Sequence, residues 1–182
     1  MALKLYIVND FFTNKRSSDI TMFMKKILIS ACLLGEPVRY DGVSKPLVHP
    51  LIDELNERGR LVPFCPEVAG GLPTPRPPAE ISGGDGRQVI GQAARVMTRE
   101  ADVSRAFVLG ARAALDLALE QGITIALLKE RSPSCGSSFI YDGSFSGTRI
   151  KGMGVTTALL RENGILVFSE NDISCLEKRI KR

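Results

Sequence analysis

Three cysteines that lie far apart in the chain are the residues best suited to chemistry. Cys32, Cys65 and Cys135 each follow a segment with the hydrophobic pattern of a buried β-strand. Because the carboxyl ends of parallel strands meet at one edge of a sheet, the three thiols are expected to converge there. The fourth cysteine, Cys175, falls inside a predicted C-terminal helix, where we expect a partly buried structural thiol.

Converging thiols at this spacing allow a structural zinc ion, an iron-sulfur cluster with an incomplete ligand set, or a nucleophilic cysteine. Structural zinc ranks last, because its ligands usually include pairs about two to four residues apart. The single histidine, His49, precedes Pro50 at a predicted helix start and is expected at the surface or as a cap. Three soft thiolates on a four-iron cluster would leave one iron open as a Lewis acid. The spacing alone leaves these alternatives open.

Composition and charge exclude several classes of protein. The chain has 182 residues, 44% hydrophobic and 24% charged, which is typical of one compact soluble domain. No apolar run reaches the roughly 18 residues of a membrane span, and residues 1–23 lack the apolar core of a signal peptide. We therefore expect a cytoplasmic protein with no membrane partner, whose cysteines serve metal binding or catalysis. The net charge of +4 is too small to predict a nucleic-acid partner.

Strand and helix patterns alternate along the chain. Strands are predicted at 25–30, 61–64, 123–128 and 165–168, and helices at 46–58, 102–121, 155–163 and up to about residue 181. Residues 66–80 are expected to form a proline-rich loop without helix, and 81–90 a hairpin whose second strand is 87–90. A second hairpin is expected around residues 142–143. This order predicts an α/β fold with an open, mainly parallel, Rossmann-like sheet and helices on both faces.

Several long motifs in the sequence resemble the 2-thiouracil desulfurase family. They read SACLLG at 30–35, RYDG at 39–42, CPEVAGGLPTPRPPAE at 65–80 and SPSCG at 132–136. The resemblance runs from Met24 to about Phe168, so residues 24–182 are predicted to form one desulfurase-like domain and residues 1–23 an N-terminal extension. It implies a 4Fe-4S cluster held by Cys32, Cys65 and Cys135, with the fourth iron open to substrate sulfur.

Four further residues are predicted to have roles, Glu67 and Ser132 because of the resemblance and Ser134 and Arg76 because of their side-chain chemistry. Glu67 matches the catalytic glutamate of the family, and the mechanism needs such a base to activate water. Ser132 is predicted to be catalytic on the same ground. Ser134 is predicted to contact water or a ring carbonyl of the substrate, and Arg76 to donate a fork of hydrogen bonds to a carbonyl of the base.

These features together predict an enzyme that desulfurises a small thiolated nucleobase such as 2-thiouracil. The expected products are the oxygenated base and sulfide, formed by hydrolysis without net redox change. Two alternatives stay open: a non-catalytic nucleobase-binding module, which needs no open iron, and a structural zinc protein, which metal analysis would identify. A sulfur-transfer enzyme acting on thiolated tRNA has little support from the modest charge, and no oligomeric state is predicted.

Overall fold

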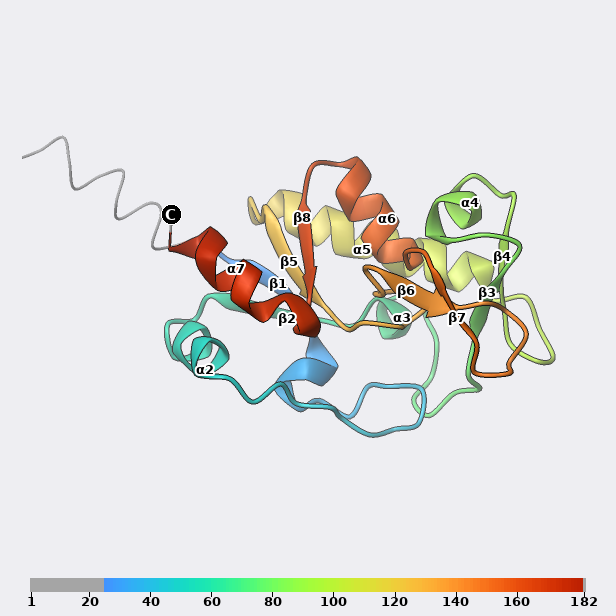
Figure 1. Ribbon diagram of the computed structural model, residues 1–182, viewed down its shortest axis with the longest axis horizontal. Coiled ribbons are helices and arrows are strands. Elements are labelled where there is room, and N and C mark those ends of the chain that lie inside the picture. Colours follow the sequence, from blue (N-terminus) through green and yellow to red (C-terminus); the bar gives the residue numbers. More distant parts are fainter. Residues whose placement is uncertain (1–24, 182) are drawn as a thin grey trace, which may run out of the picture.

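The computed structural model describes residues 25–181, so the predicted extension at 1–23 lies outside the described residues (Figure 1). Four parallel strands form the central sheet in the order β2-β1-β5-β8. Their bounds are Ile27–Ser30 for β1, Leu61–Phe64 for β2, Ile125–Leu128 for β5 and Leu166–Ser169 for β8. The predicted α/β fold with an open parallel sheet is confirmed. The edge strand β2 is only partly buried, although a buried strand was expected there.

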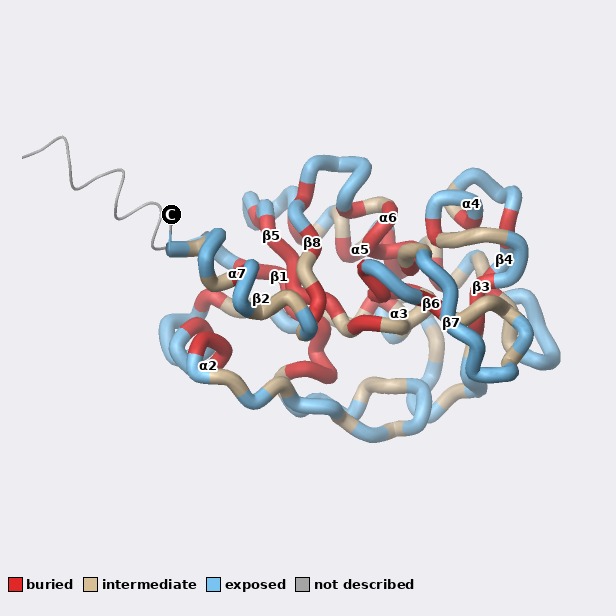
Figure 2. The backbone as a smooth tube through the Cα atoms, viewed as in Figure 1, coloured by how far each residue is buried: buried red, intermediate tan, exposed pale blue. Residues whose placement is uncertain are grey.

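Both faces of the sheet are covered by helices because its central strands are apolar on both sides. All residues of β1 and β5 are buried (Figure 2). Ile27, Ile29 and Leu127 pack with α2 (Pro50–Glu57) and α7 (Ile173–Ile180). Leu28 and Ala126 point the other way and pack with α5 (Ser104–Glu120) and α6 (Val155–Glu162). This alternation along the strand is the usual period of two.

A second group of elements lies beside the sheet, around the N-terminal half of α5 (Figure 1). It consists of two antiparallel hairpins, β3 (Glu80–Ser82) with β4 (Arg95–Met97) and β6 (Phe139–Tyr141) with β7 (Arg149–Lys151), and of α4 (Gly86–Ile90). Ile81, Phe107 and Ile140 form its core. The hairpin expected around residues 142–143 is therefore present. None of the helices in residues 25–181 is long and apolar enough to cross a membrane.

The predicted returning strand at residues 87–90 is wrong, because these residues belong to helix α4. Asp85 accepts a hydrogen bond from the backbone N–H of Arg87 at 2.9 Å, and the Gln88 side chain accepts one from the Asp85 N–H at 2.9 Å. This reciprocal capping box starts a helix and satisfies backbone donors that a strand would have paired differently. The returning strand comes later, as β4.

The proline-rich segment after Cys65 also contains a helix that was not expected. Pro66–Ala69 forms the single turn α3, with proline at its first position, where a missing N–H costs nothing. This turn packs directly on α5, since a Cβ at Gly70 or Gly110 would overlap the backbone of the facing segment. The close contact fixes α3, and with it the residues that follow Cys65, against the longest helix.

Candidate active site

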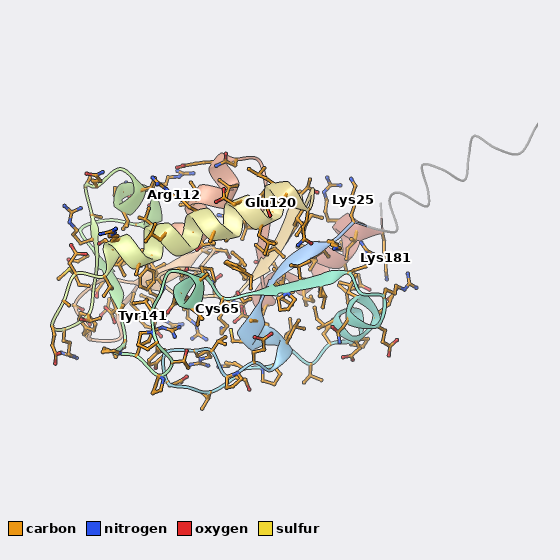
Figure 3. The ribbon with its side chains drawn as sticks, turned by 180° about the vertical axis from the view of Figure 1, so that it is seen from behind. Lys25, Cys65, Arg112, Glu120, Tyr141 and Lys181 are labelled. Carbon is orange, nitrogen blue, oxygen red and sulfur yellow. The ribbon has the colours of Figure 1, made fainter. Side chains whose placement is uncertain are left out.

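The three cysteines expected to converge line one cavity of about 490 Å³ at the carboxyl ends of the sheet strands. Cys32 lies in the 3₁₀ turn η1 (Ala31–Leu34) after β1, Cys65 lies between β2 and α3, and Cys135 lies in the loop after β5. Figure 3 shows Cys65 at the junction of its strand and helix. Cys32 and Cys135 are 7% and 5% exposed, so the thiols face the cavity from a largely buried wall.

The surroundings of the thiols favour metal binding over a free nucleophile. Burial, and next the nearby Cys65, raise the pKa of Cys32 to about 11. Burial likewise raises the pKa of Cys65 and of Cys135, where the charge of Glu67 is the second cause. Buried thiols with raised pKa are inert unless a metal replaces their protons and balances the thiolate charge. Their soft sulfur donors suit iron in a cluster.

The cavity between the thiols has room for more than a single ion. Cys32, Cys65 and Cys135 all line this cavity of about 490 Å³. The donor set and the cavity therefore fit a polynuclear iron-sulfur cluster.

Glu67 lies in the wall of the same cavity and is held from two sides. Its Oε2 accepts a hydrogen bond from Nε of Arg76 at 2.9 Å and lies 2.8 Å from Nη2 of the same guanidinium as an ion pair. Its Oε1 accepts a hydrogen bond from the Ser132 hydroxyl at 3.1 Å. The short helix α3 presents this carboxylate two residues after Cys65. The structure thus brings the predicted base next to the predicted ligands.

Arg76, predicted to bind substrate, lines the cavity and donates four hydrogen bonds within the protein. Nε donates to Glu67, and the others reach the Val38 carbonyl at 3.0 Å, the Pro73 carbonyl at 3.0 Å and the Thr74 hydroxyl at 3.1 Å. The side chain is only 5% exposed. These contacts position Glu67, and the predicted contact of Arg76 with substrate stays a prediction.

The two predicted serines occupy different environments. The Ser132 hydroxyl lines the cavity, donates to Glu67 and accepts the backbone N–H groups of Ser134 and Cys135 at 3.0 and 3.1 Å. Ser134 is fully buried, and its hydroxyl forms a 2.8 Å hydrogen bond with that of Thr156 in α6. Ser134 is not among the residues that line the cavity, and its predicted contact with substrate stays a prediction.

Two site residues were missed by the sequence analysis, namely Lys129 and Glu130, which follow β5 directly and line the cavity. The carboxylate of Glu130 is 4% exposed and accepts hydrogen bonds from Ser137, Ser138 and Phe139. Burial alone would raise the pKa of Glu130, but these hydrogen bonds outweigh it and hold the pKa below its usual value. The strand-end rule that selected the cysteines applies equally to both residues.

The remaining cysteine and the histidine are remote from this chemistry. Cys175 lies on α7 outside the cavity wall, as expected, but it is exposed where partial burial was predicted. His49 caps α2, because its Nδ1 accepts a hydrogen bond from the Leu51 N–H at 3.2 Å. The predicted capping role of His49 is confirmed.

Comparisons with known proteins support the predicted cofactor and family. A solved structure of a 4Fe-4S-dependent thiouracil desulfidase, TudS, is 53% identical, covers 86% of this chain and 98% of its own, and superposes with a TM-score of 0.79. An uncharacterized protein of Bacillus subtilis strain 168, YbbK, is 44% identical over 151 residues, which are 81% of this chain and 97% of that protein. The solved relative depends on the cofactor that the sequence predicted here. Residues 27–172 match the 2-thiouracil desulfurase family, and the chain belongs to that family.

Proposed function

We propose that this enzyme hydrolyses the carbon-sulfur bond of a small thiolated nucleobase such as 2-thiouracil, giving the oxygenated base and sulfide. The observation that carries the proposal is the convergence of Cys32, Cys65 and Cys135 on one cavity whose wall holds Glu67. The three thiolates would hold a 4Fe-4S cluster, and the 53% identity to a 4Fe-4S-dependent thiouracil desulfidase supports this assignment.

Three protein ligands leave one of four irons without a side chain, and when bound the cluster would supply there a Lewis acid for thiocarbonyl sulfur. The protein contributes the thiolates and the partly apolar wall that limits water around them. Phe64, Pro66 and Pro78 belong to this wall and offer flat apolar surface to a planar ring. Because the iron of such a cluster prefers soft ligands, it would bind the sulfur of a thiolated base in preference to the oxygen of an ordinary base.

Glu67 is assigned the work of a general base. It takes one proton from water while the water oxygen forms a new bond to the thiocarbonyl carbon and the carbon-sulfur electron pair leaves with the sulfur. Water supplies the new oxygen and the protons, so no oxidant or reductant is consumed. Arg76 fixes Oε2 of Glu67, and Ser132 aligns Oε1 while joining it to the loop of Cys135.

Anaerobic purification followed by chemical analysis tests the proposal directly. The protein is expected to contain about four irons with matching acid-labile sulfide per chain, and to convert 2-thiouracil into uracil with one sulfide released per base. Iron-replete protein that forms no oxygenated base from thiouracil would contradict the proposed reaction. A stoichiometric zinc content without iron would contradict the proposed cofactor.

A further inference from the structure

Lys129 is a cation in the cavity wall to which the proposed reaction assigns no role. It directly follows β5, and its backbone N–H donates to the Ser30 hydroxyl at the end of β1 at 2.9 Å. Lys129 lines the cavity together with Cys32 and Cys135, and its side chain is only 13% exposed. A largely buried cation therefore lies at the strand ends that also carry the thiols.

An acidic partner fixes the direction of the Lys129 side chain. Glu170, in the 3₁₀ turn η2 (Glu170–Asp172) after β8, forms a largely buried ion pair with Nζ of Lys129 through Oε1. Oε2 of Glu170 accepts the backbone N–H of Glu130 at 2.7 Å. With both of its oxygens engaged, Glu170 cannot swing away from Lys129 without losing a second hydrogen bond.

The ammonium group of Lys129 retains one unused donor. Of its three N–H groups, one contacts Glu170 and one reaches the Glu130 carbonyl at 3.3 Å. Among residues 25–181, the third has no protein acceptor. Lys129 therefore has a donor to offer a bound ligand.

Lys129 and Cys32 line the same cavity, whereas Glu170 lies in the turn after β8 and is not among the cavity-lining residues. Of the two members of the ion pair, the lysine is therefore the one that belongs to the cavity wall. Negative charge that develops on sulfur in this partly buried space is stabilised by a nearby fixed cation.

We propose that Lys129 is a further catalytic residue, which donates a hydrogen bond and positive charge to the sulfur as it leaves the thiocarbonyl carbon. Glu170 is its positioning residue. This inference rests on the proposed function and adds to it a group that stabilises the charge on the leaving sulfur. After water has added to carbon, the carbon-sulfur bond breaks and its electron pair moves to sulfur. The second water proton passes from the new hydroxyl to the sulfur as C=O forms, so the sulfur departs as hydrosulfide beside the ammonium, and Glu67 retains the first proton.

The test uses Lys129→Met, Lys129→Arg and Glu170→Gln in the iron-loaded protein, with Lys181→Met as the matched control. Lys181 forms an exposed ion pair with Glu177 on α7, so its loss removes one positive charge far from the cavity. Iron content, thiouracil turnover and the reduction potential of the cluster are measured for each. The potential responds to local charge whether or not turnover occurs.

We expect Lys129→Met to keep its iron, to lose on the order of a hundredfold in kcat and to shift the potential to more negative values. Glu170→Gln should shift the potential in the opposite direction, and Lys129→Arg should recover part of the kcat. Unchanged potentials in both variants, shifts of the same sign, iron loss in Lys129→Met, or a kcat within a few-fold of wild type would each overturn the proposal. Absence of turnover in the wild type would refute the proposed function instead, while the potentials would still report whether Lys129 faces the cluster.

Discussion

The Arg76 guanidinium and the Glu67 carboxylate form a largely buried ion pair in which Nε and Nη2 both contact the same oxygen, Oε2, at 2.9 and 2.8 Å. The other carboxylate oxygen is left to Ser132. Arg76 therefore holds one oxygen of the proposed base, and the Ser132 hydroxyl is the hydrogen-bond donor to the other. Changes at Glu67 and at Arg76 are expected to have different consequences.

Replacing Glu67 by glutamine tests the base itself. Glutamine keeps the size of the side chain but cannot take a proton from water, and general base catalysis typically contributes about 10² to 10⁴ in rate. Glu67→Gln is expected to keep its iron and colour and to lose at least about a hundredfold in turnover. Addition of thiouracil should still perturb the cluster spectrum. Turnover within a few-fold of wild type would make Glu67 a bystander, and loss of iron would make its role structural.

Replacing Arg76 by lysine separates positioning from substrate binding. One ammonium group cannot serve the Glu67 carboxylate, two carbonyls and a hydroxyl at once. Because the hydrogen bonds of Arg76 go to protein groups, Arg76→Lys should lower kcat by about tenfold or more and leave KM within a few-fold. Steady-state kinetics with thiouracil measure both constants. A variant with raised KM and unchanged kcat would instead restore the substrate contact predicted from the sequence.

The ligand assignment is tested by four single alanine variants. Cys32→Ala, Cys65→Ala and Cys135→Ala each remove a thiol from the cavity and are expected to bleach the anaerobically purified protein. Cys175→Ala is the control, because its thiol is exposed on α7 and outside the cavity wall. Visible absorption and iron analysis decide the comparison. Equal iron loss in the Cys175 variant would refute the assignment.

Glu130 should make the stability of the protein depend on pH. Its pKa in the folded state is lowered from the usual 4.5 by hydrogen bonds from Ser137, Ser138 and Phe139 that outweigh burial. A depressed folded pKa stabilises the protein fully above the unfolded pKa, and this contribution is lost as pH falls through the folded pKa. Glu130→Gln should therefore lower the free energy of unfolding by about 1–3 kcal/mol at pH 7 and by less below pH about 4. Urea denaturation at a series of pH values measures this difference, and one that stays constant with pH would contradict the argument.

The predicted domain boundary is tested by deleting residues 1–23. Since the family match begins at residue 27 and the sheet begins with β1, the shortened chain is expected to fold and to retain full turnover. Thermal denaturation and thiouracil turnover compare it with the full chain. Reduced solubility or turnover would show that the extension packs on the domain.

The alternation of strands and helices could be predicted from the sequence, because the hydrophobic patterns of β1, β5 and α5 are strong. These patterns mark the residues that a compact fold must bury. The site could be predicted as far as the cysteines and Glu67, because strand ends and motifs mark them without any knowledge of contacts. Residues 87–90 were misassigned because the glycines before them suit a turn as well as a helix start. The choice was decided by the Asp85 and Gln88 cap.

Only the tertiary structure decided which partners the polar residues near the cysteines have. Arg76 and Ser134 form hydrogen bonds inside the protein, whereas Lys129 lines the cavity and pairs with Glu170, a residue from a different strand end. The sequence determined the kinds of chemistry available and the edge of the sheet where they gather. It could not determine the partners, because hydrogen bonds between residues distant in sequence depend on side-chain distances that arise only when the strands and loops have packed.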